Sequence, residues 1–259
     1  MLNTSIVYAF LLVLVRITAF MVTAPVFSSK GIPNHFKLGL SFFVALVIYP
    51  TLYIGNQEIL FNSNYIILLL VETMIGLSLG WLAQLIFSAI QIAGAFIDMQ
   101  IGFAIANVID PQTGAQSPLM GNFKYTFATL LFLTINGHHL FLDGLINSYQ
   151  LISFELDWLS KLDDASTLVF VMNTFSKMFL IAFKIAAPIV GSLFIADVAL
   201  GIVARTVPQL NVFVIGLPLK ILLHFSILLM ITPALFYMFK EVFYEIFVTM
   251  RQFMELMGN

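Results

Sequence analysis

The fold of this chain is set by the stretch from Tyr65 to Ile97, which reads YIILLLVETMIGLSLGWLAQLIFSAIQIAGAFI and contains one charged residue, Glu72. A helix of about 20 apolar residues crosses the hydrocarbon core of a bilayer. As a single helix, residues 65–97 would be about 50 Å long, whereas the core is roughly 30 Å thick. The stretch therefore predicts a transmembrane helix that tilts, bends or protrudes from the bilayer.

The composition of the whole chain agrees with this prediction. Of its 259 residues, 61% are hydrophobic and 9% are charged, against about 25% charged in a typical soluble domain. A soluble domain of this size does not have enough interior to bury so much apolar surface. The formal net charge of −2 and the sparse charges argue against a nucleic-acid-binding protein, which needs a basic surface, and the absence of cysteine excludes disulfides and thiolate metal sites.

Five further apolar stretches predict membrane helices. Their ranges are 5–27, 38–54, 125–142, 168–196 and 221–239. The segment 240–259 alternates charged and apolar residues, so we expect a tail that lies at the membrane interface. The predicted fold is all-α: a polytopic integral membrane protein with about six apolar helices, kinked or re-entrant loops, and a single domain over residues 1–259.

Four charged residues fall inside these apolar stretches: Arg16, Glu72, Lys177 and Lys184. Each costs at least about 2.5 kcal/mol at the centre of a bilayer, so they should face protein or water. Lys177 and Lys184 are seven residues apart and share one face of a helix. Two interpretations stay open for them: snorkelling or structural ion pairing, with Glu72 as one possible partner, and lining of an aqueous path or a partner interface.

Short motifs give no support for an enzyme or a metal site. Gly76-Leu77-Ser78-Leu79-Gly80 matches the G-x-S-x-G of hydrolases, but that motif requires a strand, a sharp turn and a helix. Inside an apolar helix, the same two glycines favour close packing against a second helix. His138 and His139 are adjacent, which is not the spacing of two metal ligands on one helix. We therefore predict no catalytic, cofactor or metal site.

Two breaks between the apolar stretches, 98–124 and 197–220, mix apolar residues with Gly and Pro. Non-helical backbone at membrane depth persists only where it is buried in protein or lines water, so we expect buried or re-entrant turns. The first break contains Asp98-Met99-Gln100, Gly102-Phe103-Ala104, Asp110-Pro111, Gly114 and Gln116. The second contains Pro208-Gln209-Leu210-Asn211-Val212-Phe213 and Gly216-Leu217-Pro218-Leu219-Lys220.

These two segments resemble the hallmarks of the FliR family of flagellar biosynthetic proteins, and the resemblance extends over essentially the whole chain. It implies a non-enzymatic membrane subunit of the type III protein export gate. In that gate one R-type subunit joins several P-type and Q-type subunits in a helical ring around a channel for unfolded flagellar proteins. The implied location is the inner (plasma) membrane of a bacterium, at the flagellar basal body, in contact with lipids and other membrane export components.

The resemblance also implies roles for parts of the chain. Residues 1–167 would be P-type-like, residues 168–239 a Q-type-like hairpin and residues 240–259 a tail. The implied plug loop of the pore contains Asp98, Gln100, Gly102, Phe103, Asp110, Pro111, Gly114 and Gln116. The implied hairpin turn contains Pro208, Gln209, Asn211, Gly216, Pro218 and Lys220.

Two alternative functions stay open at this point. The related virulence-secretion proteins share the implied fold, so the chain can instead belong to a virulence export apparatus. Broken helices and intramembrane charges also fit a small-molecule secondary transporter, although we find no inverted repeat of interrupted helices in the sequence. No cofactor and no nucleic acid are implied by any of these functions.

Overall fold

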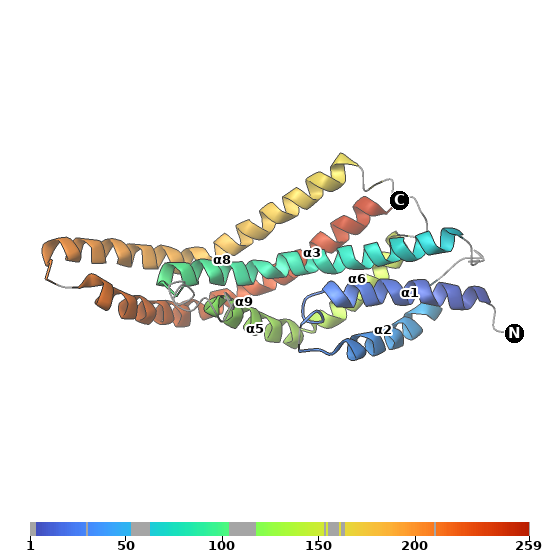
Figure 1. The fold of residues 1–259 in the computed structure, drawn as a ribbon, viewed down its shortest axis with the longest axis horizontal. Coiled ribbons are helices and arrows are strands. Elements are labelled where there is room, and N and C mark those ends of the chain that lie inside the picture. The colour runs from blue at the N-terminus through green and yellow to red at the C-terminus, as the bar shows by residue number, and fades with distance from the viewer. Residues whose placement is uncertain are drawn as a thin grey trace. The chain divides into compact units, whose positions relative to one another are not determined.

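The computed structural model describes residues 4–29, 31–52, 63–103, 118–152, 154, 161, 164–209 and 211–258. These residues form helices and contain no strand, which confirms the all-α fold (Figure 1). The elements are α1 (Thr4–Thr23), α2 (Asn34–Ile48), the short 3-10 helix η1 (Tyr49–Thr51), α3 (Ser63–Ile101), α5 (Leu119–Thr134), α6 (Gly137–Leu151), α8 (Ala165–Thr206) and α9 (Val212–Met257).

Three of the helices are longer than a bilayer core is thick. With 39, 42 and 46 residues, α3, α8 and α9 are about 58, 63 and 69 Å long at 1.5 Å per residue. The single helix predicted over residues 65–97 is confirmed and extends to Ile101. The stretches 168–196 and 221–239 form the central parts of α8 and α9.

The predicted interfacial tail is wrong in one respect, because residues 240–257 continue α9 without a break. This segment contains neither Gly nor Pro. Its apolar side chains recur at helical spacing and are buried against the protein, as at Phe243, Met250 and Met254. One face of this segment thus packs against the protein, and its location at the membrane interface stays a prediction.

The number of membrane helices is close to the prediction of about six. Within the part of the chain that the structure describes, four helical segments are long and apolar enough to cross a membrane, namely Ser5–Thr23, Asn64–Ile101, Ala165–Thr206 and Val214–Met257, and α5 with α6 forms a fifth, bent candidate. The stretch 38–54 instead gives the 15-residue α2 followed by η1 at Pro50, which is short for a span. The stretch 125–142 is broken at Asn136, whose φ of 58° is left-handed and stops a right-handed helix.

By packing, the chain forms two compact units. The first unit comprises residues 1–87, 135–175 and 244–259, and the second comprises residues 88–134 and 176–243. The division into P-type-like and Q-type-like parts is of a different kind, since it follows from the family resemblance, and it stays a prediction.

In the first unit, α1 lies directly against α3 at the glycines of the G-x-S-x-G pattern. A Cβ atom at Gly76 would overlap the backbone carbonyl of Arg16, and one at Gly80 would overlap Thr23. The hydroxyl of Thr23 also donates a hydrogen bond to the carbonyl oxygen of Leu77 at 3.2 Å. The prediction that these glycines serve helix packing is therefore confirmed.

Aromatic contacts join the other helices of the first unit. The ring of Phe141 on α6 lies 5.7 Å from that of Phe20 on α1 and 5.5 Å from that of Phe247 on α9, measured between centroids. The rings of Phe170 on α8 and Phe253 on α9 are 6.0 Å apart. Since aromatic pairs at these distances attract each other, they fix the C-terminal part of α9 in this unit.

In the second unit, α5 packs against both α3 and α9. A Cβ atom at Gly94 of α3 would overlap the backbone of Gly121 in the first turn of α5. On its other side, α5 places Phe127 5.2 Å from Phe236 of α9, between ring centroids. These contacts hold the end of α3 and the start of α5 close together.

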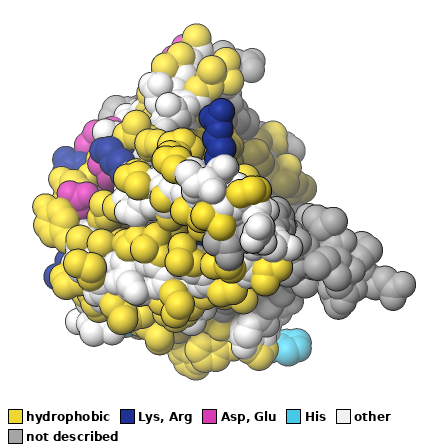
Figure 2. Space-filling model, turned by 90° about the vertical axis from the view of Figure 1, so that its left-hand side faces the viewer, with side chains coloured by type: hydrophobic (Ala, Val, Ile, Leu, Met, Phe, Trp, Pro, Cys, Tyr) yellow, Lys and Arg dark blue, Asp and Glu magenta, His cyan; other side chains and the backbone are white. Residues whose placement is uncertain are grey.

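Large apolar side chains also remain exposed on the single chain. Leu229 and Met230 on α9 are 77% and 81% exposed. Figure 2 shows a face of the molecule on which hydrophobic side chains predominate and charged ones are few. Water-exposed surfaces rarely carry such extensive apolar patches, so these side chains fit a lipid environment or contact with other membrane proteins.

Candidate functional site

The predicted plug segment begins where α3 ends in a tight turn. Gly102 has a φ of 103°, which residues with a side chain rarely adopt. The amides of Gly102 and Phe103 both donate hydrogen bonds to the carbonyl oxygen of Asp98, at 3.1 and 3.0 Å. This is the usual way in which a helix ends at a left-handed glycine, and it explains why the hallmark has Gly at this position.

Four of the eight predicted plug residues can be placed: Asp98, Gln100, Gly102 and Phe103. The other four, Asp110, Pro111, Gly114 and Gln116, lie outside the described residues. The structure therefore shows how the two ends of the segment are attached.

Asp98 joins the two ends of the predicted plug segment. Its carboxylate accepts hydrogen bonds from the amide of Met120 at 2.9 and 3.1 Å and from the amide of Gly121 at 3.5 Å. These amides belong to the first turn of α5, where a helix has unpaired N–H groups and attracts negative charge. A single buried carboxylate thus connects the last turn of α3 to the first turn of α5.

Two further buried polar residues surround this attachment. Lys124, one turn further along α5, is 2% exposed and interacts electrostatically with Asp98. His224 of α9 is fully buried, and its Nε2 lies 3.3 Å from the sulfur of Met120. The sequence analysis gave neither residue a role at this site, although both lie close to the quoted segments in the chain.

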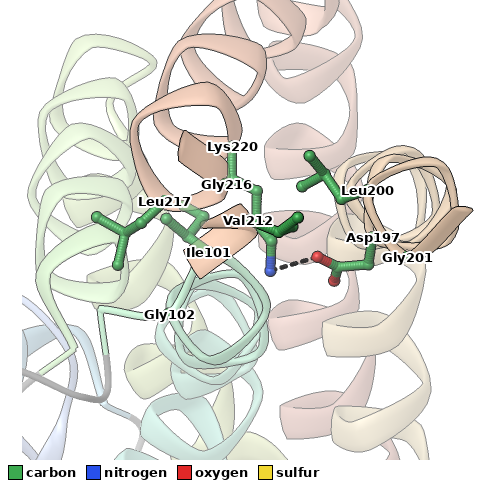
Figure 3. Close-up of a pocket in the computed structure, with 9 residues that line it drawn as sticks. All are labelled: Ile101, Gly102, Asp197, Leu200, Gly201, Val212, Gly216, Leu217 and Lys220. Atoms are coloured by element: carbon green, nitrogen blue, oxygen red, sulfur yellow. Dashed lines mark ion pairs between the residues drawn. The ribbon is translucent and has the colours of Figure 1, made fainter. Parts of the chain in front are cut away.

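A second polar cluster joins the two hallmark segments to each other. The side-chain amide of Gln100 donates to Oδ2 of Asp197 at 2.8 Å, and Nζ of Lys220 lies 2.6 Å from Oδ1 of the same carboxylate. Lys220 also donates to the backbone carbonyl of Gln100 at 3.0 Å. Figure 3 shows the Lys220 side chain of α9 reaching Asp197 on α8 beside the end of α3.

The sequence analysis missed Asp197, which holds Gln100 and Lys220 together. A signal was present in the sequence, because Asp197 is the only acidic residue in the apolar segment that forms α8. A carboxylate in such a segment requires a partner of opposite charge or a donor. The same argument was used for the four intramembrane charges named from the sequence, and it would have identified Asp197 as well.

A hollow of about 320 Å³ lies beside the Asp197–Lys220 ion pair (Figure 3). Its walls come from the end of α3, the C-terminal part of α8 and the start of α9, and they are largely apolar. Three glycines contribute to the lining: Gly102, Gly201 and Gly216. A Cβ atom at Gly216 would lie 3.2 Å from a side-chain methyl group of Leu200, so the side chain of Leu200 on α8 packs closely against α9 here.

The predicted hairpin turn is shorter than the break 197–220. Between α8 and α9 the described residues are 207–209 and 211, so Pro208, Gln209 and Asn211 lie in or beside the turn, and all three are exposed on the single chain. The remaining motif residues, Gly216, Pro218 and Lys220, lie within α9. The expectation of a buried turn over the whole break is corrected, because helices in apolar surroundings tolerate an internal Pro when neighbouring helices compensate for its missing N–H.

A family model described as "Bacterial export proteins, family 1" matches residues 7–246, which include both segments of this site. The chain belongs to this family.

Flagellar relatives of family 1 match nearly the full length. The chain is 47% identical over 250 residues to "Flagellar biosynthetic protein FliR" of Bacillus subtilis (strain 168), with 96% of each chain covered. It is 30% identical over 234 residues to the protein of the same name from Escherichia coli (strain K12), with 90% of this chain and 88% of the relative covered. "Yop proteins translocation protein T" of Yersinia pestis is 29% identical over 212 residues, with 81% and 80% covered.

In this member of family 1, two of the four predicted intramembrane charges pair with each other. Nε of Arg16 lies 2.5 Å from Oε2 of Glu72, and Nη2 of Arg16 lies 2.8 Å from Oε1. Arg16 also donates to the hydroxyl of Ser148 at 3.1 Å and to the carbonyl of Ile152 at 3.2 Å, and its guanidinium lies 4.2 Å from the ring centroid of Tyr149. Both charged side chains are fully buried.

This arrangement corrects one expectation about the remaining charges. Glu72 is engaged by Arg16, so it is not the partner of the α8 lysines. Lys177 is partly buried and Lys184 is exposed, and both belong to the second unit of this family 1 protein. Their role at an aqueous path or a partner interface stays a prediction.

Proposed function

We propose that this chain is a non-enzymatic subunit of the type III export gate that serves flagellum assembly, where it helps to form and close the channel for unfolded flagellar proteins. The observation that carries the proposal is the meeting of Gln100 and Lys220 at Asp197, because it joins both hallmark segments of the family in one site. The names of the relatives support flagellar biosynthesis as the process.

Closure follows from the chemistry of the segment between α3 and α5. Asp98 and Gln100 hold its base by hydrogen bonds, which leaves the intervening residues 104–117 as the part that acts in the channel. Several of these residues are apolar, including Ile105, Val108 and Ile109. Apolar side chains in a narrow pore exclude water and thereby block ions. The energy for export is supplied by partner components.

The partners are P-type and Q-type subunits of the same gate, together with other membrane export components and lipids. Residues 1–167 serve as the P-type-like part, residues 168–239 as the Q-type-like hairpin and residues 240–259 as the tail. The exposed apolar side chains of α8 and α9 support this assignment, since they need either lipid or protein to cover them. The location is the inner (plasma) membrane at the flagellar basal body.

A virulence export apparatus is the second candidate, and the similarity to the Yersinia pestis translocation protein supports it. The higher identity to the Bacillus subtilis flagellar protein favours flagellar export. Restoration of swimming in a bacterium whose own R-type gene is deleted distinguishes the two functions. Failure to restore swimming when the cognate P-type and Q-type subunits are co-expressed would contradict the flagellar proposal.

Closure is tested by shortening the segment. Removal of part of residues 106–117 should leave assembly with P-type and Q-type partners intact, while the membrane becomes permeable to small ions and growth slows. The control is an equal deletion within residues 55–60, which should cause no leak. Loss of assembly without any leak in the 106–117 variant would favour a packing role for the segment.

A further inference from the structure

A second hollow, of about 400 Å³, lies within the first unit and is not used by the proposed mechanism. One wall is α6 and the other is the C-terminal part of α9. These walls are fixed by the ring contact of Phe141 with Phe247, and Nζ of Lys161 donates to the carbonyl oxygens of Met257 and Gly258 at the end of α9. The hollow is therefore preformed.

The floor of this hollow is apolar. Met250 and Met254 are almost fully buried beneath it, and Phe247 and Leu151 line it as well. Gly144 of α6 widens it, because even an added Cβ atom would reach Met250 only at 3.4 Å, an ordinary contact distance. Left open to water, an apolar floor of this kind is unfavourable.

The rim of the hollow is polar and acidic. Asp143, Asn147 and Gln150 follow one another at i, i+4 and i+7, so they stand on one face of α6, and all three are exposed. On the opposite wall, Arg251 forms an ion pair with Glu255 at 2.8 Å. Asp143 has no ion-pair partner among the described residues, so the rim carries one uncompensated negative charge.

An apolar floor beneath an acidic rim matches one type of guest. A long basic side chain lays its aliphatic stem on apolar surface and keeps its charged head at the edge. Arginine fits better than lysine, because its planar guanidinium presents several donors at once to the oxygens of Asp143, Asn147 and Gln150. A phospholipid headgroup fits less well, since its phosphate would approach the acidic rim.

From this geometry we infer that the hollow between α6 and the end of α9 receives an arginine side chain from a helix of a neighbouring export-gate subunit. The inference rests on the proposed function, which supplies the neighbour. It assigns Asp143 to partner recognition and makes the first unit a docking surface in addition to its role in the fold.

The test uses the full chain co-expressed with its P-type and Q-type partners, with recovery in the complex normalised to the amount of chain in the membrane. Asp143→Asn should lower recovery by about two- to fivefold, because the arginine then loses its counter-charge at the edge of the hollow. Gln252→Lys is the matched control: it changes the net charge by the same amount on an exposed position of α9 outside the hollow, and it should assemble normally.

A second pair of variants tests whether assembly requires the hollow to be open, by adding side chains of different size at Gly144. Gly144→Leu should block assembly by filling the space, whereas Gly144→Ala should be tolerated. In addition, a photo-crosslinking amino acid at Gln150 should form an adduct with an arginine-containing segment of a partner subunit. Normal assembly of both Asp143→Asn and Gly144→Leu, or a crosslink to lipid only, would overturn the inference. If even the unaltered chain fails to assemble with these partners, the proposed function itself fails.

Discussion

Arg16 and Glu72, 56 positions apart in the sequence, form a fully buried ion pair with two parallel contacts between guanidinium and carboxylate. The pair connects α1 to α3, and Ser148 and Ile152 extend the connection to α6 and the residue that follows it. Two charges in an apolar interior are tolerated here because each donor group that remains on the arginine also finds a partner.

We expect the removal of either member of this pair to be strongly destabilising. Arg16→Met or Glu72→Met alone leaves the other side chain as an uncompensated buried charge, at a cost of about 3–5 kcal/mol. The double variant Arg16→Met/Glu72→Met should be less damaging than the sum of the two. The measurement is the thermal unfolding of the purified export complex. Simple additivity of the two effects would show that the ion pair does not couple α1 to α3.

Gly80 should not tolerate a side chain, because even one methyl group would meet Thr23 and the backbone of α1. Gly80→Ala is expected to destabilise the protein by about 1–3 kcal/mol through overpacking. Gly39→Ala is the control, since no atom lies within 4 Å of its added Cβ and the helix propensity of Ala is higher. The amount of each variant in membranes gives the comparison. Equal amounts would argue against close packing of α1 on α3.

Asp197→Asn or Lys220→Gln should loosen the base of the plug segment without preventing assembly. The side chain of Lys220 is 18% exposed and that of Asp197 is 35% exposed. The ion pair between them therefore contributes about 1 kcal/mol or less to stability. We therefore expect a small rise in ion leak, below about tenfold, measured as dye or ion flux in cells. Lys240→Gln removes an exposed charge elsewhere on α9 and should cause none. A leak of equal size in all three variants, including the Lys240→Gln control, would show that the Asp197 cluster does not contribute to closure of the channel.

Lys177 and Lys184 should tolerate Arg better than Leu if they meet water or acidic partner groups. If they only snorkel, the double Leu variant should be neutral or stabilising, because the cost of burying charge disappears. Swimming of cells that carry the double Leu and the double Arg variants provides the comparison. Full motility of the double Leu variant would exclude the aqueous-path interpretation.

The long apolar run from Tyr65 to Ile97 and the glycines within it were predictable, because hydrophobic length and small-residue spacing are local properties of the sequence. The boundaries of α8 and α9 were not. Gly216 and Pro218 suggested a wide break, but tertiary surroundings compensate for a missing N–H, and this information is absent from the local sequence. At Asn136 the error is the reverse: hydropathy predicts one continuous helix over 125–142, but the left-handed backbone of Asn136 divides it into two helices.

The candidate site was predictable in its residues but not in its connections. The segments that contain Gln100 and Lys220 were identified from sequence, whereas Asp197, which joins them, was not. The partner of Glu72 was not identified from the sequence either, because a charge pair across 56 positions depends on which helices lie side by side. Hydropathy and short motifs do not determine that choice.

The positions of Lys220 and His224 have a mechanical consequence. They are four residues apart on α9 and therefore stand on the same side of that helix. Lys220 touches Gln100, just before the segment leaves α3, and His224 touches Met120, just after it enters α5. One helix, α9, therefore contacts the chain on both sides of the segment. A rotation of α9 about its axis would therefore displace the end of α3 and the start of α5 in the same direction.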